Sequence, residues 1–452
     1  MRSALPIPWS GQTDLSKPLL VSVGIAFAAA ATGCVLAPQW FWLPLALVAV
    51  GGVGILAYRN TIAFCVVWLL IAGATLEMTL ADMVGIELYQ PVIAAVKAGG
   101  IILALLCMLR YGLYPDVFNP GLAFVAMFAL GLMHGLHPNL STADSVRSLI
   151  GSIAPFAFGF SRLSPRWGRA MVRATAWIPL MSVAAAAVLA LAGLRPLFYE
   201  SGGERLAGLG HPAFLAGFCL AAIYACLIEL YRDGESRWML LLALNFVILA
   251  LTGARAPMAY AVAVTGLTLV FVRATAFPPR CRILPILVAA CLLPALVVLA
   301  SHLTEIRLFN VLTSEAGNLS GRELLLPPFE QAAEASPWFG WGVGAGNAII
   351  PPDSEIAQQI QSWAAHNEYL RMRVEGGQLG RALLIVMFVL WVTLHTRRLC
   401  RTDRAIMRLV FLAFAAHAYT DNVLISTTAC VFFAFVTAVF ARGRLMNTVE
   451  KA

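Results

Sequence analysis

One short polar segment interrupts a chain that is otherwise mostly apolar. Residues 365–377 read AHNEYLRMRVEGG, and His366 is the best candidate in the chain for a general base. Neighbouring positive charge favours the neutral form of an imidazole, and a neutral imidazole can take a proton from a sugar hydroxyl. The alternative is a histidine on a helix surface that is bonded to a backbone carbonyl.

Arginines in segments far apart along the chain are candidates for binding an anion: Arg147, Arg205, Arg255 and Arg322. The planar guanidinium group fits phosphate oxygens and stays charged in partly apolar surroundings. If a helix bundle brings these side chains together, they could hold a pyrophosphate. Alternatively, each arginine reaches lipid headgroups or pairs with a nearby carboxylate, for which the sequence offers Asp144, Glu204 and Glu323.

The remaining histidines and the cysteines give no sign of a metal site. His134, His137 and His302 lie at predicted helix ends, but no carboxylate joins them at a diagnostic spacing. The cysteines are scattered, and no pair has the spacing of a metal or redox motif. The sequence therefore predicts neither a metal nor a cofactor.

The elements that position these residues are membrane helices. The chain has 452 residues, of which 60% are hydrophobic and 12% charged, whereas soluble proteins carry about 25% charged residues. Apolar runs of roughly 18 residues or more recur, and each is long enough to span a bilayer as a helix. We expect an all-α polytopic integral membrane protein. No long basic stripe of a nucleic-acid-binding domain is present.

The predicted chain has about 12 transmembrane helices, with a range of 12–14, because some short apolar runs could form tight hairpins or broken elements. The first run, 19–36, is interpreted as a retained helix and not as a cleaved signal peptide. The expected spans are 19–36, 39–57, 61–79, 91–110, 119–136, 146–161, 169–193, 211–231, 237–251, 255–272, 283–302, 379–396, 405–418 and 423–441.

The loop charges predict the orientation. Arginine clusters at 162–173 and 397–404, together with both termini, fall on one side, which the positive-inside rule makes cytoplasmic. His366 and the four candidate arginines then lie on the outer side. We expect an N-terminal transmembrane bundle at 1–302, a large outer loop at 303–378 that carries catalysis, and C-terminal transmembrane helices with a short cytoplasmic tail at 379–452.

The second half of the outer loop is expected to be one amphipathic helix at the membrane surface. Asp353 or Ser354 can cap it, and the glycine pair Gly376–Gly377 is expected to end it. Its apolar positions follow a helical spacing: Ile356, Ile360, Trp363, then His366 and Leu370.

The motifs of this loop, in their order, resemble those of the O-antigen ligase/polymerase superfamily. Gly321–Arg322 is followed by PWFGWGVG at 337–344, by HNEYL at 366–370 and by EGGQLG at 375–380. The superfamily carries GR, P-x-x-G-x-G-x-G, H-N-x-Y/L-L and E-x-G-x-x-G in one large loop between late spans. Within it, the chain is most similar to the O-antigen ligases.

The resemblance implies a metal-independent, inverting glycosyltransferase of the GT-C type in the inner membrane. Such an enzyme moves a glycan from undecaprenyl pyrophosphate to a sugar hydroxyl of lipid A–core at the periplasmic face. The loop histidine of the family corresponds to His366, and the four arginines correspond to its phosphate-binding residues. Asn367 and Glu368 would orient the base or bind sugar, and Asp421, in a predicted outer turn, joins the site.

Other readings remain open. A polymerase that joins repeat units differs from a ligase only in its acceptor. A protein O-oligosaccharyltransferase usually has a larger C-terminal outer region, whereas here the chain stops soon after the last expected span. A lipid or sugar transporter is less compatible with the sequence, because we find no internal repeat and the polar residues gather at the outer face instead of the midplane.

Overall fold

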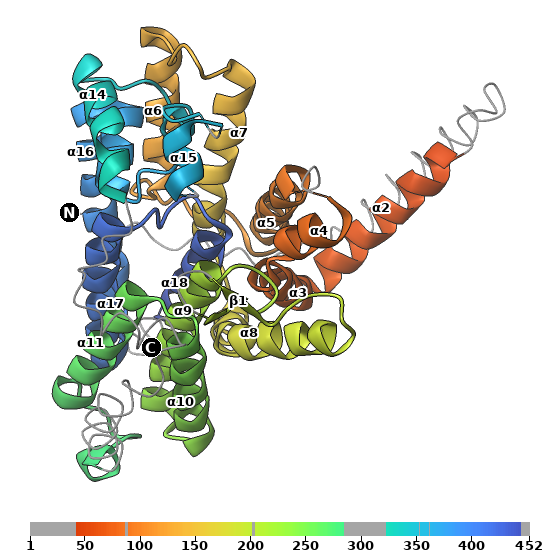
Figure 1. Ribbon diagram of the computed structural model, residues 1–452. Helices are drawn as coiled ribbons and strands as arrows, with labels where there is room; N and C mark the ends of the chain where they lie inside the picture. The colour runs from red at the N-terminus through yellow and green to blue at the C-terminus, as the bar shows by residue number, and fades with distance from the viewer. Residues whose placement is uncertain are drawn as a thin grey trace, which may run out of the picture. The chain divides into compact units, whose positions relative to one another are not determined.

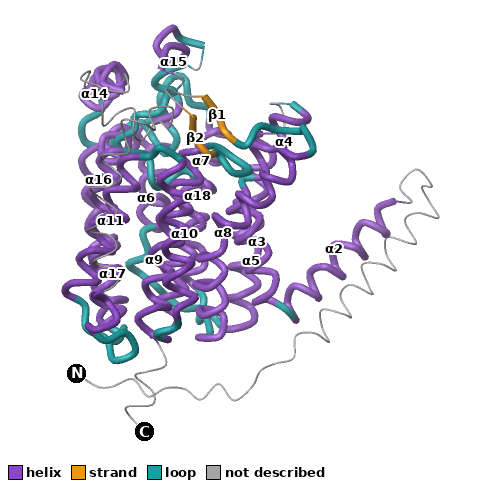
Figure 2. The backbone as a smooth tube through the Cα atoms, turned by 60° about the horizontal axis from the view of Figure 1, so that its bottom comes forward, coloured by secondary structure: helices purple, strands orange, loops and turns teal. Residues whose placement is uncertain are grey.

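The computed structural model describes residues 42–85, 89–200, 204–283, 322–351, 353–360 and 362–443; Figures 1 and 2 show the arrangement of its elements. In chain order these are α2 (Trp42–Arg59), α3 (Thr61–Ala74), α4 (Leu76–Val84), α5 (Tyr89–Tyr111), α6 (Gly121–His134), α7 (Thr142–Ile153), η3 (Ala154–Phe160), α8 (Pro165–Leu191), β1 (Phe198–Glu200), β2 (Glu204–Leu206), α9 (Pro212–Asp233), α10 (Ser236–Leu251), α11 (Arg255–Phe271), η4 (Arg322–Leu325), α14 (Leu326–Ala335), η5 (Ala345–Asn347), α15 (Glu355–Ile360), α16 (Glu368–Arg397), α17 (Arg401–Thr420) and α18 (Thr427–Gly443). The η elements are 3₁₀-helices, and β1 pairs with β2 in an antiparallel sheet.

The chain divides into two units, Met1–Phe64 and Cys65–Ala452. The described part of the first unit consists of α2 and the first turn of α3, in which the backbone N–H of Phe64 donates to the carbonyl of Asn60 at 3.1 Å. Every candidate site residue belongs to the second unit.

Several helices meet the requirements for crossing a membrane. Within the described residues, α5, α8, α9 and α16 are long and apolar enough, and the bent pair Gly51–Arg59 with Thr61–Ala74 is a fifth candidate. The apolar helices α6, α10, α11 and α18 are shorter. The structure therefore fits the predicted all-α membrane protein, whereas the count of 12–14 spans stays a prediction. The expected span 19–36 and residues 284–302 of the expected span 283–302 lie outside the described residues.

Most of the expected spans that the structure describes coincide with a helix to within a few residues, but two are broken. The span 61–79 divides after α3, where Thr75 has a positive φ of 47°. The span 146–161 begins in α7 and ends in η3, whose Pro155 supplies no backbone N–H for a continuing α-helix.

The helix α9 lies among α8, α10, α11 and α18, and most of its side chains are buried. Near its C-terminus the buried Glu229 accepts hydrogen bonds from Arg173 of α8, at 2.8 Å, and from Arg442 of α18. Arg232 donates to the buried Asp403 of α17 at 2.9 Å. Because buried charges need partners, these ion pairs hold the ends of four helices together on the side that the loop charges predict to be cytoplasmic.

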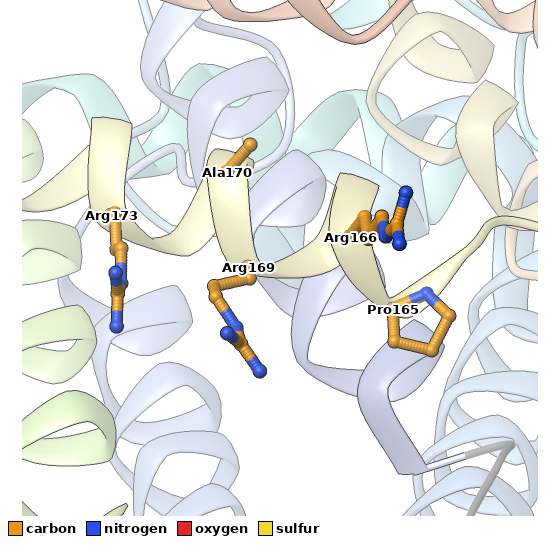
Figure 3. Close-up of a pocket in the computed structure, with 5 residues that line it drawn as sticks. All are labelled: Pro165, Arg166, Arg169, Ala170 and Arg173. Carbon is orange, nitrogen blue, oxygen red and sulfur yellow. The ribbon is translucent and has the colours of Figure 1, made fainter. Parts of the chain in front are cut away.

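The arginine cluster at 162–173 also carries exposed charge. Figure 3 shows Arg166, Arg169 and Arg173 along the first turns of α8, where Arg173 is engaged by Glu229 and Asp233. Arg166 and Arg169 are exposed. They belong to the positive cluster that predicts the orientation of the chain.

The described part of the long loop has a small core of its own. Leu325 of η4, Phe329 of α14, Ala345 of η5 and Val374 of α16 are completely buried against one another and their neighbours. The indole N–H of Trp341 donates to the carbonyl of Ala332 at 2.7 Å. The helix α14 packs against α16 (Figure 1).

The expectation of one continuous amphipathic helix in this loop is wrong. Ser354 does cap a helix, since its hydroxyl accepts from the backbone N–H of Ala357 at 3.3 Å, but α15 ends at Ile360. His366 then has a positive φ of 46°, which no α-helix accommodates. A new helix, α16, begins after Asn367, whose side chain accepts from Leu370 N–H at 3.1 Å.

The glycine pair bends α16 instead of ending it. Gly377 has φ 61° and ψ −163°, and the helix continues beyond it to Arg397. The glycine-rich segment PWFGWGVG occupies the bend: Trp341 N–H donates to the carbonyl of Val374 at 2.9 Å, and Gln378 N–H donates to the carbonyl of Pro337 at 2.8 Å. The segment therefore satisfies backbone groups that the bend leaves without helical partners.

Candidate active site

A cavity of about 1490 Å³ lies among the helices of the second unit. Pockets for drug-sized ligands measure about 300–1,000 Å³, so this one has room for a larger molecule. Its walls come from α5, α7, α9, α11, the segment before α16, and the turn between α17 and α18. Of the residues predicted for the site, it is lined by Arg147, Arg205, Arg255, His366 and Asp421.

His366 is held between two side chains. Its Nδ1 atom lies 3.0 Å from Oδ1 of Asp421, and its Nε2 atom lies 2.7 Å from Oγ of Ser362. The His366 side chain is 18% exposed and that of Asp421 is 36% exposed. The same carboxylate oxygen accepts from the backbone N–H of Asn422 at 2.9 Å, which fixes it at the end of α17. The alternative of a histidine bonded to a backbone carbonyl is not what these contacts show.

Arg205 and Arg255 approach the cavity from neighbouring segments. Arg205 lies on β2 opposite Tyr199 and is 9% exposed; its Nε donates to the carbonyl of Thr252 at 2.8 Å. Thr252 is followed closely by Arg255, the exposed first residue of α11. The N-terminus of a helix carries partial positive charge, which repels a cation such as the guanidinium of Arg255. An anion bound there would interact favourably with both.

Arg147 enters the cavity from α7. Its guanidinium pairs with Asp144 at 3.0 Å, and 59% of its side chain is exposed. The carboxylate pairing that the sequence offered as an alternative is thus present for this arginine. Exposed ion pairs of this kind contribute little energy, so the guanidinium remains accessible to an anion in the cavity.

Arg322 is the first residue of η4, and the structure does not describe its side chain. Leu324 of the same turn lines the cavity, so η4 borders it. The predicted contact of Arg322 with phosphate stays a prediction.

Asn367 and Glu368 are engaged within α16 and are not among the residues that line the cavity. Asn367 caps the helix, and the buried Glu368 accepts from Nε of Arg371 at 2.9 Å. Arg371 also donates to Glu375 at 2.8 Å. The predicted roles of Asn367 and Glu368 in binding sugar or orienting the base stay predictions.

Reasoning from the sequence missed a group of charged residues in the cavity wall. Lys97 of α5 donates to the carbonyl of Ile425 at 2.9 Å, and the buried Glu77 of α4 accepts from Thr427 at 2.9 Å. The second carboxylate oxygen of Glu77 has no partner among the described residues. A charged residue inside an apolar run is itself a signal of function, and it could have singled out both.

The other predicted histidines pack against the glycine-rich segment. His134 lies against Phe339 with ring centroids 5.2 Å apart, and His137 lies edge-on to Trp341 at 5.5 Å. Burial lowers the pKa of His137. His302 falls outside the described residues. Within those residues, no group of three His, Cys, Asp or Glu side chains is arranged to hold a metal.

The cavity thus combines a histidine that contacts a carboxylate with arginines from three other segments. This arrangement suits removal of a proton from a hydroxyl while negative charge develops on a phosphate nearby. Nothing in this chemistry requires the residues to be close in sequence: Arg147 and Asp421 line the same cavity although they lie far apart along the chain.

A family model described as O-antigen ligase matches residues 240–385. The match runs from α10 to the bent part of α16 and includes Arg255, Arg322 and His366. No curated protein matches the chain. Arg147 of α7, Arg205 of β2 and Asp421 after α17 lie outside the matched residues, but they line the same cavity.

Proposed function

Because the chain belongs to the O-antigen ligase superfamily, whose members act on lipid-linked glycans, we propose that it is an O-antigen ligase. It would transfer O-antigen polysaccharide from undecaprenyl pyrophosphate to a sugar hydroxyl of lipid A–core, in lipopolysaccharide biosynthesis. The observation that carries the proposal is the cavity, because His366 and three arginines from separate segments line the same walls.

The acceptor hydroxyl loses its proton to Nε2 of His366 in the proposed reaction. Asp421 accepts from Nδ1–H and so keeps Nε2 free of a proton and directed to the acceptor. As the proton leaves, the acceptor oxygen attacks the anomeric carbon of the donor. Asp421 then stabilises the positive charge that the ring acquires.

The bond between the anomeric carbon and the phosphate oxygen breaks in the same displacement, and the configuration at that carbon inverts. The electron pair leaves with the undecaprenyl pyrophosphate. Arg255, Arg205 and Arg147 offset the charge that builds on it, and the proposal adds Arg322 from η4. Fixed cations at a departing phosphate supply the electrostatic stabilisation that a metal supplies in other enzymes.

The outer loop 303–378 carries the base in this proposal, the helices of 1–302 contribute the lipid-facing walls, and 379–452 contributes Asp421. The site faces the periplasm of a multi-pass inner-membrane protein with both termini in the cytoplasm. Membrane helices give the lipid-linked donor a path to the cavity while the acceptor reaches it from the aqueous side. The GT-C assignment rests on the resemblance of the loop motifs.

The experiment is reconstitution of the purified protein with lipid-linked glycan and lipid A–core, followed by electrophoresis of the products. A ligase produces a ladder of glycan-modified lipid A–core. Elongated lipid-linked glycan without that ladder would point to a polymerase, and no covalent product at all would favour a transporter.

The H366A variant tests the base in the same assay. We expect it to insert in the membrane and to lose transfer by at least about a hundredfold. The matched control is H134A, which removes an imidazole that packs on Phe339. Full activity of H366A would remove His366 as the base.

A further inference from the structure

The hydroxyl of Ser362 contacts Nε2 of His366, the nitrogen that takes the proton in the proposed reaction. Its Oγ lies 2.7 Å from Nε2, and both residues line the cavity. Ser362 stands in the turn between α15 and α16, two residues past the end of α15. The backbone N–H of Ala364 points at the same Oγ from 3.4 Å, which holds the hydroxyl on the side of the imidazole.

The partners of the ring determine which atom carries the proton. A carboxylate accepts hydrogen bonds and cannot donate them, so the contact of Asp421 with Nδ1 requires the proton on Nδ1. Nε2 of the neutral ring is then an acceptor, and the hydroxyl of Ser362 must donate to it. In the resting site, a hydroxyl group already makes the hydrogen bond that a base makes to its substrate.

The backbone keeps the two groups together. His366 has φ 46°, in the left-handed region that is unfavourable for a residue with a Cβ. This conformation turns the chain back, so that the ring meets a hydroxyl four residues earlier although no helix joins them. Strain of this kind persists where surrounding contacts hold it, here the bonds to Asp421 and Ser362.

We propose that the hydroxyl of Ser362 stands in for the acceptor hydroxyl at Nε2 and is displaced when the acceptor sugar binds. The inference rests on the proposed function, because it takes His366 as the base. The ligand that replaces Ser362 is a sugar bearing a free hydroxyl. Ser362 itself forms no bond to the substrate carbon.

The resting contact competes with the acceptor and not with the donor, because the phosphates of the donor bind to the arginines. Removing the hydroxyl should therefore increase the affinity for the acceptor and leave the affinity for the donor unchanged. One exchanged hydrogen bond corresponds to about a threefold to tenfold change in affinity. The donor KM should not change.

The test compares S362A, S362T and S362C with the wild-type full-length protein, in steady-state transfer and in equilibrium binding of the lipid A–core acceptor without donor. S362A should lower the acceptor KM and Kd by about threefold to tenfold, with an unchanged donor KM. S362T keeps the hydroxyl and should resemble wild type, and S362C, a weaker donor, should fall between. S354A is the matched control, since the hydroxyl that it removes caps α15 and donates to the carbonyl of Pro351.

Unchanged or weaker acceptor binding in S362A would overturn the inference, and if S362A does not fold, equal acceptor constants for S362C and S362T would do the same. Loss of transfer in S362A, together with labelling of Ser362 by a fluorophosphonate in the wild-type protein, would overturn the inference in favour of a serine nucleophile. An active H366A variant would instead contradict the proposed function. An inactive H366A with an S362A variant of unaltered acceptor KM would refute only the role of Ser362.

Discussion

Oδ1 of Asp421 lies 3.0 Å from Nδ1 of His366, across 55 residues of sequence. The histidine stands before α16 and the aspartate stands at the end of α17, so the contact joins the loop 303–378 to the C-terminal helices. The packing of α16 against α17 brings the two ends together. The proposed base and the carboxylate that would orient it thus come from different parts of the chain.

Replacing Asp421 by asparagine should slow transfer by about a hundredfold or more, because the amide leaves either tautomer of the ring allowed and cannot stabilise an imidazolium. The measurement is the initial rate of glycan transfer at saturating donor and acceptor. The control is D353N, which alters an exposed carboxyl before α15. Equal rates for D421N and wild type would show that the carboxylate does not act through His366.

Replacing Arg255 by alanine should lower the rate by about a hundredfold to a thousandfold, because a fixed charge near the leaving pyrophosphate is lost. Lysine at this position should recover part of the rate, since it restores the charge but not the planar fork. The variant R169A removes an exposed arginine of α8 (Figure 3) that does not line the cavity, and it should transfer normally. Normal turnover of R255A would count against pyrophosphate binding at α11.

Hydropathy predicted the positions of the long apolar helices well, for a physical reason. A helix satisfies its own backbone groups, so a long apolar run in a membrane has little choice of structure. The spans 91–110, 169–193 and 211–231 accordingly match α5, α8 and α9 closely. The same reasoning failed where contacts from elsewhere decide the backbone.

His366 and Gly377 illustrate that failure. Local spacing favoured one helix through His366 and an end at the glycines, but the turn at His366 depends on Asp421, 55 residues away. The bend at Gly377 depends on backbone groups of the glycine-rich segment. The sequence singled out Arg147, Arg205 and Arg255 because charge at an outer membrane boundary is costly, yet only the fold shows that they share a cavity.

Transfer should continue when a chelator is added. The proposed leaving-group stabilisation comes from guanidinium groups, which chelation does not affect. The measurement is the rate of ladder formation with and without EDTA, after dialysis of the protein against the chelator. Loss of activity that one divalent metal restores would overturn the metal-independent mechanism.

Gly377 should be the least replaceable residue of the α16 bend. Its φ of 61° and ψ of −163° fall in a region that is essentially restricted to glycine. A Cβ at this position would lie 2.2 Å from the backbone carbonyl of Trp338, which cannot move aside without displacing the glycine-rich segment. We expect G377A to destabilise the protein by about 1–3 kcal/mol or more, measured as a lower midpoint of thermal unfolding in detergent.

The matched control is G266A in α11, where no atom lies within 4 Å of an added Cβ. There alanine should leave the midpoint unchanged or raise it, because alanine is the better helix former by about 0.5–1 kcal/mol. Equal midpoints for G377A and G266A would show that the bend does not depend on this close approach.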